Sequence, residues 1–144
     1  MSMKKLSVLL PLVLFALTLL EGCSSKIEGI ALQVQLVKLE RQTNGSFLAS
    51  LLFSNPNVNG VNVVKSTHQV SLNGKPAGVL EVTEPIGIPA QQTVTTAATF
   101  TPSNGTTDLS GSVSYQLASL LTVSIYDNDI ERYKTNSSGA VTVR

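Results

Sequence analysis

Residues 47–74 read FLASLLFSNPNVNGVNVVKSTHQVSLNG, and their pattern gives the clearest indication of the fold. Its first part has apolar side chains at alternate positions, the period of two that buries one face of a β-strand: Phe47, Ala49, Leu51 and Phe53. Pro56 has no backbone N–H to give to a sheet and biases Asn55 towards extended geometry, so the strand should end there. A second strand follows, with one face formed by Val64, Ser66, His68, Val70 and Leu72. Asn73-Gly74 then predicts a tight hairpin turn.

Short alternating runs continue along the rest of the chain. We expect strands at Ile30–Val37, Val79–Thr83, Gln92–Phe100, Val113–Leu117, Leu121–Ile125, Ile130–Lys134 and Ala140–Val143. The segments between them are rich in turn-forming residues and are expected to be turns or loops: Lys75–Gly78, Ile86–Pro89, Thr101–Ser110, Asp127–Asp129 and Asn136–Gly139. No run keeps a 3.6-residue period. The pattern therefore predicts an all-β fold, a small antiparallel β-sandwich with little or no helix.

Several short motifs occur in a fixed order in this region. They are F-x-A-x-L-x-F-x-N-P-N, V-S-L-N-G, Ile88-Pro89-Ala90 before alternating Thr and Val, V-S-Y-Q-L at Val113–Leu117, and S-G-A-V at Ser138–Val141. This ordered set resembles the WHy domain of type 2 late embryogenesis abundant (LEA14-like) proteins. The resemblance implies a fibronectin- or immunoglobulin-like sandwich, an association with desiccation and other stresses, and no catalytic residues. It also implies a structural role for Asn55, Pro56, Asn57, Asn73, Gly74, Ile88, Pro89 and Ala90.

The N-terminal segment has a different character. Lys4 and Lys5 precede an apolar run from Leu6 to Leu20. As a helix this run would extend about 22 Å, short of the roughly 30 Å hydrocarbon core of a bilayer. A basic start, an apolar middle and a small residue before the break are typical of a secretory signal. The break, Leu20-Glu21-Gly22-Cys23, resembles a bacterial lipobox, although Glu21 stands where a small uncharged residue is usual.

Cys23 is the only cysteine, which excludes an intramolecular disulfide and a cysteine-based metal site. We expect a signal peptide at 1–22, a lipidated tether at 23–29 and one domain at 30–144. Two or more acyl chains on Cys23, palmitate among them, would hold the protein on a membrane stably. Ser24 follows the cysteine where Asp would signal retention, and by resemblance to Gram-negative sorting this favours an outer membrane lipoprotein facing the periplasm. An uncleaved N-terminal anchor is the alternative.

Charge and composition exclude one class of partner. Without residues 1–22 the chain has eight basic and eight acidic residues, scattered and without a basic block. Nucleic-acid binding therefore lacks its electrostatic footprint. Uncharged polar residues dominate instead, with 13 Thr, 15 Ser, 9 Asn and 7 Gln. They indicate a β-domain, expected to be monomeric, with a surface rich in hydroxyl and amide groups.

Few residues suggest a catalytic or metal-binding role. His68 is the only histidine and lacks a G-x-S-x-G motif or an accompanying acid, so we expect a half-buried or interface strand residue, not a catalytic base. Asp127-Asn128-Asp129 could ligate calcium, but the Gly and Glu of an EF-hand loop are missing and the same residues suit a turn. Glu81 and Glu84 flank a loop and are expected to be solvated. The sequence therefore predicts no enzyme, no metal and no cofactor.

Tyr126 and Tyr133 flank the predicted Asp127–Asp129 turn. If the hairpin pairs around residues 128–129, the two rings would lie roughly opposite each other. They would then either pack together at a sheet edge or form a small recognition patch.

Two functional hypotheses follow from the sequence. The first is a membrane-anchored, non-catalytic lipoprotein that helps the cell envelope survive water loss or related stress. The second is an envelope scaffold or assembly lipoprotein that binds a protein partner through an edge of its sheet.

Overall fold

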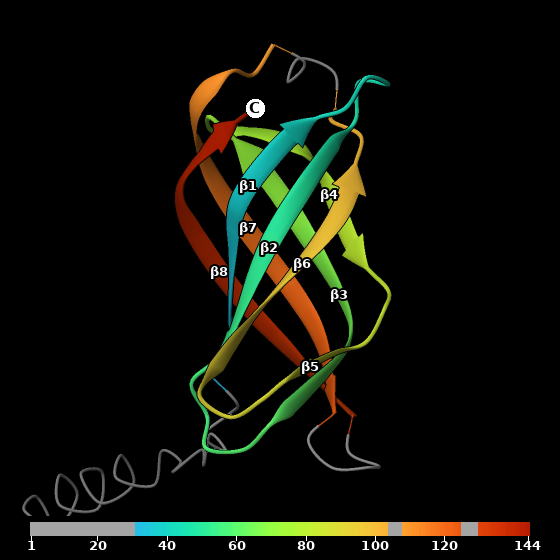
Figure 1. Cartoon of the computed structure of the whole chain (residues 1–144), viewed down its shortest axis with the longest axis vertical. Helices are drawn as coiled ribbons and strands as arrows, with labels where there is room; N and C mark the ends of the chain where they lie inside the picture. The colour runs from blue at the N-terminus through green and yellow to red at the C-terminus, as the bar shows by residue number, and fades with distance from the viewer. Residues whose placement is uncertain (1–30, 104–107, 125–129) are drawn as a thin grey trace, which may run out of the picture.

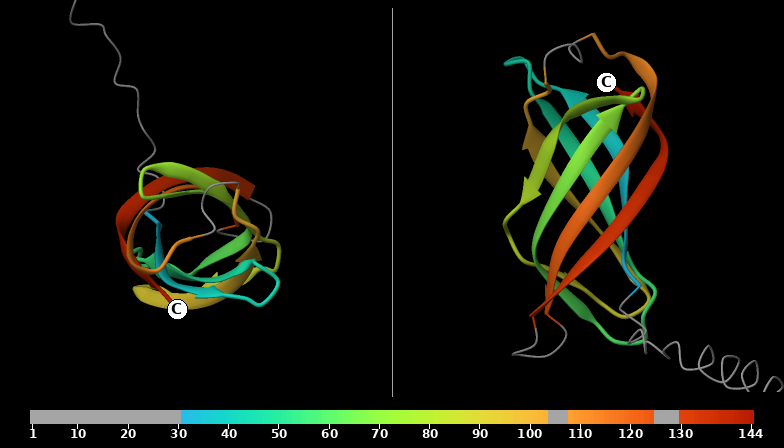
Figure 2. Two further views of the ribbon diagram at one scale, coloured as in Figure 1. Left: turned by 90° about the horizontal axis from the view of Figure 1, so that it is seen from above. Right: turned by 180° about the vertical axis from the view of Figure 1, so that it is seen from behind.

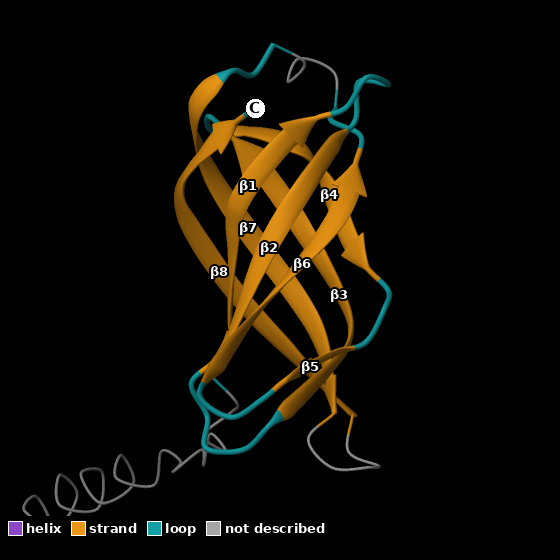
Figure 3. Cartoon of the chain, viewed as in Figure 1, coloured by secondary structure: helices purple, strands orange, loops and turns teal. Residues whose placement is uncertain are grey.

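The computed structural model describes residues 31–103, 108–124 and 130–144 (Figure 1). Within these ranges the chain is all-β as predicted, with strands joined by loops and no helix (Figure 3). The strands are β1 (Gln33–Arg41), β2 (Phe47–Asn55), β3 (Val61–Leu72), β4 (Lys75–Val82), β5 (Ile86–Ile88), β6 (Gln92–Phe100), β7 (Gly111–Ser124) and β8 (Ile130–Val143). The predicted signal segment, Cys23, the tether and the Asp127–Asp129 turn lie outside the described residues.

The strands form one curled sheet in the order β4-β3-β7-β8-β1-β2-β6, with β5 paired to the start of β3. Neighbouring strands are antiparallel except β8 and β1, which run parallel and pair at Leu39 and Val143. The views from above and behind show the sheet wrapping round, so that β3, β7 and β8 face β1, β2 and β6 (Figure 2). The molecule is thus the predicted two-layered, immunoglobulin-like body, and the parallel contact joins its layers along one side.

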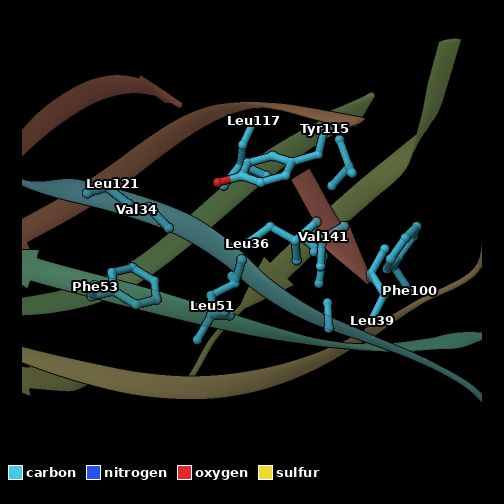
Figure 4. Packing of buried hydrophobic residues seen from close by; sticks show 14 of the residues in the cluster. Val34, Leu36, Leu39, Leu51, Phe53, Phe100, Tyr115, Leu117, Leu121 and Val141 are labelled. Carbon is cyan, nitrogen blue, oxygen red and sulfur yellow. The ribbon is translucent and has the colours of Figure 1, made fainter. Parts of the chain in front are cut away.

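The core lies between these layers. It is formed by the alternate side chains that the sequence predicts, and Figure 4 shows those of several strands pointing towards one another. Phe47, Ala49, Leu51 and Phe53 of β2 are all 1% exposed or less. At the end of the core where β2 begins, Phe47 stacks on Phe100 of β6 with ring centroids 5.8 Å apart. The strict alternation of β2 makes it the most regular strand of the core.

Two β-bulges change which side chains enter this core. In β1 the register shifts between Leu36 and Lys38, so Leu36 and Leu39 are both buried while Val37 is 46% exposed. In β3 it shifts between Val63 and Lys65. The prediction that Val64 shares a face with Ser66 is therefore wrong, because Val63 takes the buried position and Val64 is half-buried. Each bulge inserts one residue and reverses the phase of the alternation beyond it.

The C-terminal half forms two long strands where four short ones were predicted. β7 and β8 each contain 14 residues and pair without interruption from Gly111–Val143 to Ser124–Ile130. The predicted turn at Asn136–Gly139 is wrong, because these residues continue β8. Tyr115 explains how Gly139 is accommodated, since a Cβ on Gly139 would lie 3.1 Å from the Tyr115 ring. The aromatic ring covers the gap that the glycine leaves in the strand.

Two predicted loops are also strands. β4 begins immediately after the Asn73-Gly74 turn, so Lys75–Gly78 is not a turn; an irregularity between Val70 and Ser71 accommodates the extra residue. Ile86–Ile88 forms β5, which pairs with Val61–Val63. Pro89 ends β5, in keeping with the missing backbone donor of proline.

Candidate functional site

His68 lies in the middle of the core, on the inner face of β3. Its side chain is 0% exposed and its ring meets Phe53 edge-on, with centroids 5.9 Å apart. The imidazole Nδ1 is 2.7 Å from Ser119 Oγ, and Nε2 is 2.8 Å from Ser66 Oγ. The expectation of a half-buried or interface residue is therefore wrong. We call Ser66, His68 and Ser119 the histidine cluster.

Burial lowers the pKa of His68 from 6.5 to about 4, because the imidazolium ion would lose its hydration in the core. The ring is therefore neutral at pH 7 and donates one hydrogen bond while accepting another. Ser119 and His68 are as close as a nucleophile and its base, but the second partner of the ring is Ser66 and not a carboxylate. Ser119 is itself only 5% exposed, so a substrate cannot reach it. The geometry is that of a structural cluster.

A second buried polar residue, Asn55, ends β2 at the opposite end from the Asn73-Gly74 turn. It is 1% exposed, and its amide nitrogen lies near three backbone carbonyl oxygens, those of Asn59 at 2.9 Å and of Ile88 and Pro89 at 3.1 Å. Its oxygen Oδ1 accepts hydrogen bonds from the backbone N–H and the side-chain amide of Asn57. One side chain thus ties the β2–β3 loop to the end of β5.

Asn57 extends this network to the start of the described chain. Its amide donates to the carbonyl of Ala31 and its Oδ1 accepts from the N–H of Ala31, both at 3.2 Å. The backbone N–H of Gln91, which has a φ of 55°, donates to the carbonyl of Asn57. The motif residues Asn55, Pro56 and Asn57 therefore lie beside Ile88, Pro89 and Ala90. We call this group of loops, with the entry of the chain at Ala31 and the start of β8 at Ile130 on the same end of the sheet, the base.

Asn73 and Gly74 form the turn at the other end. Their φ angles of 50° and 76° are both in the left-handed region, as a two-residue hairpin turn of the primed type requires. The side chain of Asn73 also accepts hydrogen bonds from the N–H and the hydroxyl of Ser114 at the start of β7. This turn fixes the register of β3 against β4 and holds β7 beside them.

The tyrosine pair predicted at the C-terminal hairpin has a different arrangement. Tyr133 is half-buried and its partner across the strands is Leu121, so Tyr126 is not directly opposite it. Tyr126 itself lies outside the described residues, and a recognition role for the two tyrosines stays a prediction.

Glu81 and Glu84 are exposed, as expected. In the described part of the chain no three His, Cys, Asp or Glu side chains gather into a metal site.

A shallow groove of about 360 Å³ lies on the outer face of β3, β7 and β8. The strand register brings its polar side chains together from distant parts of the sequence: Gln69, Ser71, Gln116, Asn136 and Ser138. The groove has amide and hydroxyl groups but no charge, so it suits neutral polar molecules or water. Sequence reasoning missed it, because only the register between strands reveals which exposed residues are neighbours.

No family model matches the chain, and no curated protein matches it. Solved structures do resemble it. The solution structure of AT1g01470 from Arabidopsis thaliana has a TM-score of 0.58 and 16% identity, over 79% of this chain and 83% of that one. A protein from Archaeoglobus fulgidus has a TM-score of 0.48 and 12% identity, over 79% and 96%. The putative late embryogenesis abundant protein At2g46140.1 has a TM-score of 0.42 and 15% identity, over 94% and 83%.

At these identities the comparison concerns the fold alone. The match to the Arabidopsis protein AT1g01470 covers most of both chains. No helix in the described ranges is long and apolar enough to span a membrane. The chain thus shares its fold with LEA14-type proteins.

Proposed function

We propose that this protein is a membrane-anchored, non-catalytic LEA type 2 lipoprotein of the cell envelope, and that it contributes to tolerance of water loss or related stress. The observation that carries the proposal is the LEA14-type fold, together with the motif residues that the base brings side by side. The burial of the histidine cluster supports a non-catalytic role, because neither Ser66 nor Ser119, the two serines bonded to His68, is accessible to a substrate.

In this proposal the protein acts by binding water, sugars or other protein surfaces, and not by catalysing a reaction. Its surface has hydroxyl and amide groups, and the groove at Gln69 and Gln116 is uncharged. Such groups form hydrogen bonds with water, sugars and other protein surfaces without a long-range electrostatic preference. A stable β-domain keeps this surface in place at every stage of drying. The lipid on Cys23 would keep it in the envelope, facing the periplasm.

The proposal is tested by deleting the gene and measuring survival after desiccation, osmotic shock and freezing. We expect reduced survival, restored by the wild-type gene and restored less well by Cys23→Ala, which keeps the domain but removes the attachment point. Survival equal to wild type under all three stresses would contradict the protective role. The intact mass of protein extracted from membranes tests the anchor, since a chain that begins at Cys23 and carries acyl groups is expected.

The second candidate, an envelope scaffold, is favoured by one feature of the sheet. β8 pairs with β7 along its whole length but with β1 only at Leu39–Val143, so from Ile130 to Ala140 its other edge has no paired strand among the described residues. An extended partner segment could add to such an edge by backbone hydrogen bonds. Photocrosslinking from Asn136 on β8 tests this, with Leu120 on β7 as the control, because Leu120 is also exposed but β7 is paired on both sides. One partner captured in stoichiometric amount from Asn136 alone favours the scaffold.

A further inference from the structure

The base of the domain carries the most exposed large apolar side chains of the described chain. Val58, in the β2–β3 loop, is 78% exposed, and Ile130, the first residue of β8, is 67% exposed. The other exposed large apolar residues, Val37, Val79 and Leu120, lie on strands and are 46%, 53% and 37% exposed. Scattered apolar residues on a surface are ordinary. Here the two that protrude furthest lie at the same end of the molecule.

The sheet register establishes that these two residues share one end. Asn62, close after Val58, pairs with Ser124, and Ser124 pairs with Ile130. Figure 1 shows the β2–β3 loop and the start of β8 at the lower end of the sheet, and the described chain also begins there. The opposite end contains the Asn73-Gly74 turn and the C-terminus.

The entry of the chain is fixed beside Val58. Ala31 forms two hydrogen bonds with Asn57, the residue that precedes Val58 in the loop. From Cys23 to Ala31 the chain advances eight residues, which can extend over at most about 28 Å. A lipid on Cys23 would therefore keep the base close to the bilayer, while the opposite end is separated from it by the length of the 14-residue strands β7 and β8.

The charge distribution agrees with this orientation. The loops of the base, Pro56–Gly60 and Pro89–Gln91, contain only Pro, Asn, Val, Gly, Ala and Gln. The opposite end has charged residues at Arg41, Lys75, Asp108 and Arg144. Moving amide and apolar groups into the interface of a bilayer costs far less than moving charged groups. The two uncharged loops of the base can approach lipid, and the opposite, charged end is better solvated in water.

We propose that the base is a membrane-contact surface, in which Val58 and Ile130 insert among lipid headgroups. This inference rests on the proposed lipid anchor at Cys23 and adds an orientation to it. Glu131 is exposed next to Ile130. Its carboxylate would be repelled by anionic lipid, so the surface suits zwitterionic headgroups such as phosphatidylethanolamine and phosphatidylcholine.

Single-tryptophan variants test the contact cleanly, because the chain contains no tryptophan. The full-length protein is prepared with Val58→Trp or Ile130→Trp, and with Val79→Trp as the control on the outer face of β4, where the residue is 53% exposed. Each is reconstituted in phosphatidylethanolamine–phosphatidylcholine vesicles with or without brominated acyl chains. In both base variants we expect the tryptophan fluorescence to lie at shorter wavelength than in the control, and brominated lipid to quench most of it. The fluorescence of the control variant should be unchanged by brominated lipid.

The outcomes separate the contact from the anchor. Co-sedimentation of all three variants with vesicles, and an acylated intact mass, show that the anchor is present. If the anchor is present and the base tryptophans are quenched no more than the control, the membrane contact is refuted and the proposed lipoprotein stands. If the protein neither carries acyl groups nor sediments with vesicles, the anchor fails and the inference fails with it. Quenching of the control to the same extent as the base variants also refutes a specific contact at the base.

Discussion

The domain contains two buried polar clusters that differ in their partners. Asn55 at the base bonds mainly to backbone groups, including three carbonyl oxygens that belong to two separate segments of the chain. His68 in the middle of the core bonds only to the side chains of Ser66 and Ser119. Both residues are at most 1% exposed. The two residues are equally buried, but Asn55 bonds mainly to backbone groups and His68 bonds to side-chain hydroxyls.

This difference determines what substitution can achieve. A backbone carbonyl cannot be removed by mutation, so the carbonyls near Asn55 always need a donor or water. A side-chain hydroxyl can be removed together with its partner. A buried cluster made only of side chains can be replaced by apolar residues at little cost, whereas the loss of one partner alone leaves a desolvated group unpaired. The fold therefore needs Asn55 as a donor to backbone carbonyls, whereas the histidine cluster as a whole can be replaced without a large loss of stability.

The largest effect is expected for Asn55→Leu. It removes the donor for the carbonyls of Asn59, Ile88 and Pro89 in a site that water does not reach, and we expect a loss of about 3–5 kcal/mol of unfolding free energy. Urea denaturation of the purified protein measures it. Asn59→Ala is the matched control, because the Asn59 side chain is exposed and only its backbone carbonyl takes part, so a change within about 0.5 kcal/mol is expected. Equal losses for the two variants would contradict the role of Asn55.

The sequence predicts Asn55 and His68 unequally well. The Asn-Pro-Asn and Asn-Gly signals are local, and both ends of the sheet form where those residues place them. The histidine cluster joins Ser119 to His68 across 51 positions, so only the register of β3 against β7 reveals it. A strict period of two likewise does not predict the bulges at Val37 and Val64. Leu36 and Leu39 stand three apart and could not share a face in a regular strand, yet both are buried.

The long strands β7 and β8 show a second limit of sequence reasoning. Small and polar residues such as Asn136–Gly139 favour turns locally, but pairing along the whole of β7 and the cover of Gly139 by Tyr115 outweigh that preference. Similarly, Ile86–Ile88 is too short to be identified as a strand by alternation, and it pairs because β3 offers an edge at Val61–Val63. Tertiary context decides both segments.

The next largest effect is a dependence of stability on pH through His68. In the unfolded chain the pKa of His68 is 6.5, and in the fold burial lowers it to about 4. Between these values the unfolded state binds more protons, so the free energy of unfolding falls as the pH falls from 6.5 to 4, by up to about 3 kcal/mol. Urea denaturation at pH 7 and pH 4 measures the loss. His68→Leu, as the control for the titration of carboxylates, should lose less stability over the same range, and an identical loss would contradict the assignment to His68.

The smallest effect is expected when the whole histidine cluster is made apolar. Ser119→Ala alone leaves Nδ1 of His68 without its partner in the core, and we expect it to cost about 1–2 kcal/mol at pH 7. In the triple variant Ser66→Ala, His68→Leu, Ser119→Ala every member of the cluster is replaced, so no polar group is left unpaired. Its stability should lie within about 1 kcal/mol of the wild-type value, although it carries three substitutions and Ser119→Ala only one. A triple variant that loses as much as Asn55→Leu would show that the two clusters are equally necessary, and the distinction between backbone and side-chain partners would then fail.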